Sequence, residues 1–156
     1  MVCDIMTILD KGWDLMVAHP PCTYLANSGV RWLYGGKGTQ VDERRWEAMR
    51  ESAAFFRALL GAPIPRIAVE NPIMHRHAKE IIQCDYTQIV QPWHFGDGET
   101  KATCLWLNGL APLIPTDIVS GREARVHHIS PSATRWKDRS RTPFGMASAM
   151  AAQWGV

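Results

Sequence analysis

A cysteine and a glutamate that each follow a short strand-like segment are the residues of this sequence best placed to do chemistry. Cys22 comes after residues 14–18 and two prolines, and Glu70 comes directly after residues 66–69. Proline cannot donate to a β-ladder, so we expect both segments to be strands that stop near these residues. Ligands bind at the carboxyl edge of open α/β sheets. We therefore expect Cys22 and Glu70 to lie in one site.

A thiolate beside a carboxyl group suits one reaction in particular. Attack of the thiolate on C6 of a pyrimidine, with an acid donating a hydrogen bond to the ring nitrogen, makes C5 nucleophilic towards a one-carbon electrophile. The alternative interpretation of Cys22 is a thiol that fills a gap beside a turn, because an unpaired cysteine often behaves as an inert small hydrophobe.

The order of these motifs resembles that of a known family. Pro21 and Cys22, followed by Glu70 and Asn71, are similar to the Pro-Cys and Glu-Asn motifs of DNA cytosine-5 methyltransferases, and more closely to short phage and bacterial proteins related to them. The likeness runs from about residue 10 to residue 155. It implies that Cys22 adds to C6 of cytosine, that Glu70 hydrogen bonds N3 and that Asn71 shapes the loop, with one-carbon transfer to C5.

The same resemblance implies S-adenosylmethionine as the donor, with Pro20 and Gly145 beside the donor pocket, and DNA or a pyrimidine nucleotide as the substrate. In that family, earlier strands with a glycine-containing loop hold the donor, and no such loop precedes Cys22 here. We therefore expect an incomplete donor pocket. A second copy of this chain, or another chain, would complete it by covering an exposed edge strand.

The elements predict an α/β fold, a truncated Rossmann-like, methyltransferase-type sheet that is mostly parallel and flanked by helices. Asp42 is expected to cap the clearest helix, which runs to about Leu60 with apolar residues at intervals of three and four. A shorter helix with one basic face is expected over 72–82. The remaining expected elements are strands over 14–18, 66–69, 86–91 and 102–107, and a helix over 146–154.

The length of 156 residues favours a single domain over 1–156. A net charge of +2 neither requires nor excludes a nucleic acid. Basic residues concentrate in the irregular, proline-punctuated segment 108–142, which suits a nucleic-acid backbone. That segment is too short for the target-recognition region of the related family.

Several other residues are expected to bind the substrate. Arg31 and Trp32 precede the glycine-rich residues 35–38 and would clamp a phosphate and a base, unless they belong to an ordinary surface loop. Lys101 stands where the family has its Gln-x-Arg-x-Arg motif. The full set of expected substrate-binding residues is Pro21, Arg31, Trp32, Lys101, Arg139 and Arg141.

The four cysteines contain no Cys-x-x-Cys pair, and no signal peptide or long apolar span is present. We expect a cytoplasmic protein with reduced thiols, no membrane partner and no bound metal, because the histidine pairs lack zinc-site spacing. Two alternative functions remain open. One is a non-catalytic nucleic-acid-binding or regulatory remnant of this fold, and the other is a pyrimidine-modifying enzyme with another donor.

Overall fold

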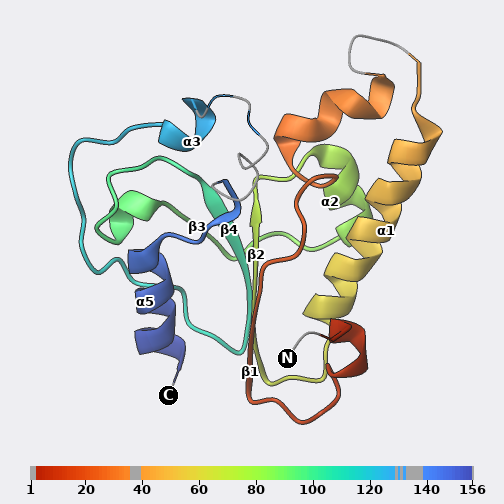
Figure 1. Ribbon diagram of the computed structural model, residues 1–156. Coiled ribbons are helices and arrows are strands. Elements are labelled where there is room, and N and C mark those ends of the chain that lie inside the picture. Colours follow the sequence, from red (N-terminus) through yellow and green to blue (C-terminus); the bar gives the residue numbers. More distant parts are fainter. Residues whose placement is uncertain (1–2, 36–39, 129, 131, 133–138, 156) are drawn as a thin grey trace. The chain divides into compact units, whose positions relative to one another are not determined.

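The structure, a computed structural model, describes residues 3–35, 40–128, 130, 132 and 139–155. It is a mixed α/β protein with an open four-stranded sheet in the order β1-β2-β4-β3 (Figure 1). The strands are β1 (Leu15–Ala18), β2 (Arg66–Pro72), β3 (Gln88–Val90) and β4 (Thr103–Asn108).

The prediction of a mostly parallel sheet is wrong. Among the strands of the described residues, β1 and β2 form the one parallel pair, and the sheet is otherwise antiparallel. The physical reason lies in the connections. A parallel pair needs a long crossover, which α1 supplies between β1 and β2, whereas β3 and β4 are joined by a stretch that contains no α-helix.

The helices follow the predicted ones closely where apolar periodicity is strong. Oδ1 of Asp42 accepts a hydrogen bond from the Arg45 N–H at 3.1 Å, which confirms the predicted cap of α1. Met49, Ala53 and Phe56 of this helix are buried, as the spacing predicts. The helical elements are η1 (Ile5–Thr7), η2 (Asn27–Tyr34), α1 (Glu43–Leu60), α2 (Arg76–Ile82), η3 (Pro92–His94), α3 (Arg125–His128) and α5 (Phe144–Trp154).

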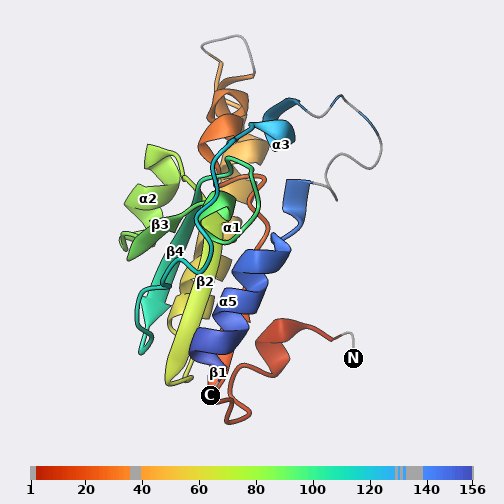
Figure 2. The same ribbon diagram turned by 90° about the vertical axis from the view of Figure 1, so that its left-hand side faces the viewer.

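The chain divides into two compact units, and the single-domain expectation stays a prediction. The first unit comprises the residues up to 88 together with 104–110. In it α1 packs against α2, and η1 and η2 lie at opposite ends of the β1–β2 pair (Figures 1 and 2). Its core includes Phe56, which meets Trp106 of β4 edge-on with ring centroids 4.9 Å apart.

The start of α2 differs from the prediction. The strand before it continues through Pro72, and the helix begins only at Arg76. His75, expected on a solvated basic face, is instead the buried N-cap, and its Nδ1 accepts a hydrogen bond from the Ala78 N–H at 3.1 Å. An imidazole nitrogen thus satisfies an N–H group that has no partner inside the helix.

The second unit comprises residues 89–103 and 111–156. In this unit α5 contacts the irregular segment around residue 111. Nε1 of Trp154 donates a hydrogen bond to the carbonyl oxygen of Ala111 at 3.0 Å. Gln153 exchanges two hydrogen bonds with the backbone of Ile114, each 2.9 Å long. Within segment 108–142, α3 is a short helical interruption, and the predicted basic residues Arg135 and Lys137 lie outside the described residues.

Candidate active site

Cys22 lies four residues beyond the end of β1, at the start of a tight turn. Its carbonyl oxygen accepts hydrogen bonds from the N–H groups of Leu25, at 3.1 Å, and Ala26, at 2.9 Å. Pro20 is buried, whereas Pro21 and Cys22 are exposed. Two rigid prolines followed by a closed turn therefore present the thiol at the surface.

Glu70 and Asn71 lie within β2 itself, near its carboxyl end, not after it as predicted. Residues alternate between the two faces of a strand, so these neighbours point to opposite sides. The Glu70 side chain keeps 16% of its surface exposed, and Asn71 is fully buried.

The structure brings the two motifs into contact. The register pairs Ala18, the last residue of β1, with Val69 of β2. The residues that follow this pair, His19 and Glu70, are therefore neighbours. Nδ1 of His19 lies 3.0 Å from Oε2 of Glu70. His19, three residues before Cys22, thus contacts Glu70 near the end of β2, and the joint site of Cys22 and Glu70 stays a prediction.

A hydrogen bond from Asn71 fixes the proline pair before Cys22. Its Nδ2 donates to the carbonyl oxygen of Pro20 at 3.2 Å. Oδ1 of the same buried amide has no hydrogen-bond partner in the described part of the chain. Asn71 thus connects β2 to the loop that carries Cys22.

The segments that follow the two motifs are also bound to each other. The N–H of Asn27 donates to the Ile73 carbonyl at 2.8 Å, and the N–H of His75 donates to the Leu25 carbonyl at 3.1 Å. Nε2 of His75 lies 2.8 Å from the Tyr24 carbonyl. Because Nδ1 of His75 already accepts from the backbone, Nε2 carries the proton and donates. These bonds hold the turn after Cys22 against the end of β2.

A small hollow of about 250 Å³ borders the loop. It is lined by Pro21 and by three residues of α1, Glu51, Ser52 and Phe55. Phe55 supplies an apolar wall, and Ser52 is engaged with its own helix, donating to the Ala48 carbonyl at 2.8 Å.

Arg31 and Trp32, predicted to clamp a substrate, lie on η2 and contact each other. The guanidinium of Arg31 stands 4.8 Å from the centre of the Trp32 ring, which is 46% exposed. A cation over an exposed indole adds about 0.5–1 kcal/mol and fixes the ring orientation. The glycine-rich residues 36–38 that follow lie outside the described residues.

The other predicted residues lie in the second unit. Nζ of Lys101 donates to the Arg141 carbonyl at 2.9 Å, so two expected substrate-binding residues are neighbours there. Arg139 is partly exposed. Gly145, expected beside a donor pocket, packs so closely on Phe95 that a Cβ atom would overlap the Phe95 carbonyl oxygen. The structure gives this glycine a packing role.

Electrostatics distinguish the cysteines. Burial raises the pKa of the Cys104 thiol on β4 to about 11, a shift that Lys79 opposes and the charge of Glu70 reinforces. Cys104 is buried, whereas Cys3, Cys22 and Cys84 are exposed and form no disulfide. Only the exposed thiols are accessible to a ligand.

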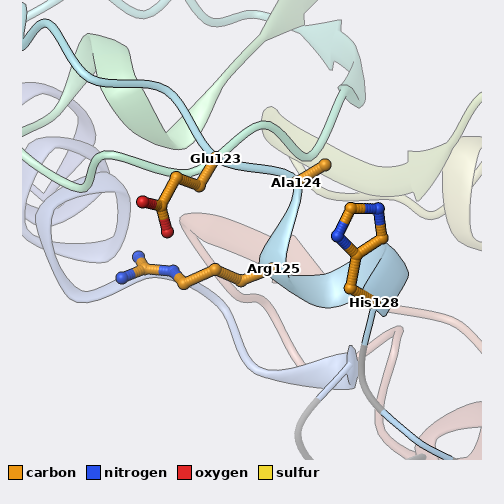
Figure 3. Close-up of a pocket in the computed structure, with 4 residues that line it drawn as sticks. All are labelled: Glu123, Ala124, Arg125 and His128. Carbon is orange, nitrogen blue, oxygen red and sulfur yellow. The ribbon is translucent and has the colours of Figure 1, made fainter.

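An open hollow of about 500 Å³ lies in the second unit, around the start of α3. Figure 3 shows the Glu123 and Arg125 side chains extending to one side and His128 to the other. The guanidinium of Arg125 is bound to the Asp97 carboxylate at 2.6 Å. Acidic partners on this surface lower its attraction for phosphate.

Two further findings concern metals and membranes. In the described ranges, no three His, Cys, Asp or Glu side chains are gathered so that they could hold a metal ion. None of the described helices has the length and apolar character needed to cross a bilayer.

The contact of His19 with Glu70 was not predicted from the sequence. The signal was present in the register. His19 follows the first strand by one residue, and Glu70 follows the last predicted residue of the second by one, so a parallel pair in register brings them together. His75 carried no comparable signal, because neither it nor its partner Tyr24 lies in or directly beside the paired strands.

The fold and the site define a mixed α/β protein with an exposed cysteine, a histidine and a carboxyl group at one end of a parallel strand pair. No protein-family model matches the chain, and no curated protein matches it significantly.

Proposed function

We propose that this chain is a DNA (cytosine-5) methyltransferase-like protein in which Cys22 adds to C6 of a pyrimidine base and Glu70 hydrogen bonds the ring nitrogen. One observation carries the proposal. The loop that presents Cys22 is bound directly to the end of β2, through His19 on Glu70 and Asn71 on Pro20. Acid-assisted addition needs a nucleophile and an acid on neighbouring elements, and their attachment to one strand pair supports the proposal.

The addition step conserves atoms and charge. The Cys22 sulfur forms a bond to C6, the π electrons of the C5–C6 bond move into the ring, and N3 takes a proton from Glu70. C5 then carries the nucleophilic character and accepts an electrophile, either a proton from solvent or a one-carbon group. Loss of the C5 hydrogen, return of the N3 proton to Glu70 and expulsion of the thiolate restore the aromatic ring.

The residues expected to border S-adenosylmethionine do not fit that role. The Pro20 carbonyl is used by Asn71, and Gly145 packs on Phe95. We therefore derive no step through this donor, and one-carbon transfer stays part of the proposal for the complete assembly.

The experiment that tests the proposal needs no donor. Reversible addition of a thiol at C6 lets C5 exchange its hydrogen with water, so the purified chain should release tritium from [5-³H]cytosine in DNA or in a nucleotide. Release should vanish in Cys22→Ser, while Cys84→Ser, another exposed cysteine, should behave as wild type. Survival of release in Cys22→Ser would overturn the proposal.

The same proposal includes the expectation that the sheet is a truncated, Rossmann-like sheet of the methyltransferase type. In its support, β1 stands at one end of the strand order, and Val17 of this strand is 38% exposed. An edge strand offers unpaired N–H and C=O groups to another chain. We propose that a second copy, or a chain bearing the donor-binding strands, pairs here, and the solution mass measured with and without DNA tests for the copy.

The alternative is a non-catalytic binder of nucleic acid. It is favoured by aromatic and cationic pairs outside the cysteine loop, since the Arg122 guanidinium lies 3.6 Å from the centre of the Trp93 ring. Such stacked pairs suit unstacked bases. Salt-dependent DNA binding that persists in Cys22→Ser, without any tritium release by the wild type, would favour this alternative.

A further inference from the structure

The contact between His19 and Glu70 is a built feature of the site that the addition chemistry does not by itself require. Nδ1 of His19 lies 3.0 Å from Oε2 of Glu70, with side chains that are 40% and 16% exposed. A carboxylate accepts and cannot donate, so the imidazole donates its Nδ1–H. This bond engages Oε2 and restricts the rotation of the carboxyl group.

The pair also has a property that neither residue has alone. Imidazole changes its charge in the neutral pH range, whereas an isolated carboxylic acid has already lost its proton there. When His19 is protonated, the pair holds one proton that it can give away. When His19 is neutral and Glu70 is ionised, the pair has none.

We propose, on the basis of the function proposed above, that His19 is the positioning residue of Glu70 and the source of the proton that N3 receives. As the sulfur of Cys22 bonds to C6, the imidazolium passes its Nδ1 proton to the Glu70 carboxyl group, and the carboxyl group gives one proton to N3. His19 ends neutral and regains its proton from water through its exposed ring. The proton count is conserved at each transfer.

Among the described residues, the other titratable and charged groups near His19 and Glu70 are Cys104, Lys79 and Cys22, and we assign the supply of the N3 proton to His19. Cys104 on β4 senses the charge of Glu70, but its buried thiol stays protonated in the neutral range. Lys79 on α2 acts on Cys104 as a cation. Cys22 on the loop must itself lose a proton to attack. Addition therefore requires an ionised Cys22 and a protonated His19, and a bell-shaped pH profile follows.

The test uses the full chain with tritium release from a [5-³H]cytosine oligonucleotide, measured across pH. His19→Ala removes both donor and charge, and the rate constant should fall about 100-fold. His19→Asn keeps an N–H group near the position of Nδ1 but cannot carry a charge. It should retain the wild-type KM and lose the alkaline limb of the profile, with a lower rate at neutral pH.

A spectroscopic readout tests the contact without turnover. In ¹⁵N-labelled protein, His19 should show a protonated Nδ1, and this signal should change in Glu70→Gln but not in the surface variant Glu80→Gln. An unprotonated Nδ1 would overturn the proposed role.

The outcomes of the kinetic test separate the two proposals. If the wild type releases tritium and both His19 variants keep its rate and pH profile, the role of His19 is wrong and the function stands. If the wild type releases none from single-stranded DNA, duplex DNA or dCMP, the proposed function fails, and the role of His19 fails with it. His19→Asn keeps the test valid if His19→Ala does not fold, which thermal denaturation would show.

Discussion

Nδ2 of Asn71 donates a hydrogen bond of 3.2 Å to the carbonyl oxygen of Pro20, and thereby joins the end of β2 to the residue that directly precedes Pro21 and Cys22. The amide is fully buried, and the loop it holds is exposed from Pro21 to Thr23. The position of the thiol thus depends on a side chain from another strand, which the loop sequence alone does not specify.

Replacing Asn71 by Ala should destabilise the protein by about 1–3 kcal/mol, because the buried Pro20 carbonyl loses its partner. The free energy of unfolding in urea measures this cost. Asn108→Ala, which removes an exposed amide at the end of β4, should change stability by no more than about 0.5 kcal/mol. Equal stabilities of the two variants would show that the Asn71 bond contributes nothing.

Stability should fall as the pH drops below about 6.5, in part because of His75. Burial lowers the pKa of His75, with the charge of His77 acting in the same direction and the hydrogen bond to Tyr24 acting against both. The unfolded chain therefore binds a proton that the folded protein excludes, and acid favours unfolding, by up to about 1.4 kcal/mol per pH unit from this residue.

The variant His75→Gln isolates that contribution, since an amide can accept and donate without titrating. Its free energy of unfolding, measured by urea denaturation from pH 5 to pH 8, should depend less on pH than that of the wild type. Burial and the charge of Arg122 both lower the pKa of His94 in the second unit. Its contribution to the pH dependence of stability is the same in both proteins, and it therefore cancels when the two are compared. Parallel pH curves for the two proteins would contradict the prediction.

The four cysteines should differ sharply in alkylation. Burial raises the pKa of Cys104 to about 11, so only on the order of one thiol in 10⁴ is ionised at pH 7, and the side chain is also inaccessible. Iodoacetamide followed by peptide mass spectrometry should label Cys3, Cys22 and Cys84 in the native protein and Cys104 only after unfolding. Native labelling of Cys104 at the rate of Cys84 would be inconsistent with this core.

The first strand pair and α1 were predictable because their signals are local. Prolines end the segment before Cys22, and the stripe through Met49, Ala53 and Phe56 has helical spacing. Once the two strands are parallel and in register, His19 at the start of the loop lies beside Glu70. The contact between β2 and the loop that follows β1 could therefore be outlined from the sequence.

The other features of the fold and of the candidate site depend on contacts between residues that are far apart in the sequence. Strand direction at β4 is set by pairing with strands on both sides, and the apolar run gives no direction. His75 looked like one of several cations on a helix face, but its burial and its capping role depend on Tyr24, which belongs to another segment. The packing of Gly145 on Phe95 joins residues 50 positions apart in sequence, and a glycine-containing turn suggests a ligand as readily as a close approach.

Gly145 provides a test in which the expected sign opposes the usual rule. An alanine inside a helix is normally more stable than a glycine by up to about 1 kcal/mol. At this second position of α5, however, an added Cβ would overlap the backbone carbonyl of Phe95, so the helix must shift and lose packing around Met146. Overpacking of this kind costs about 1–3 kcal/mol, and Gly145→Ala should lower the midpoint of thermal unfolding. Ser148→Ala, at an exposed position of the same helix, should leave it unchanged or raise it. If both variants raise the midpoint, Gly145 does not approach Phe95 as described.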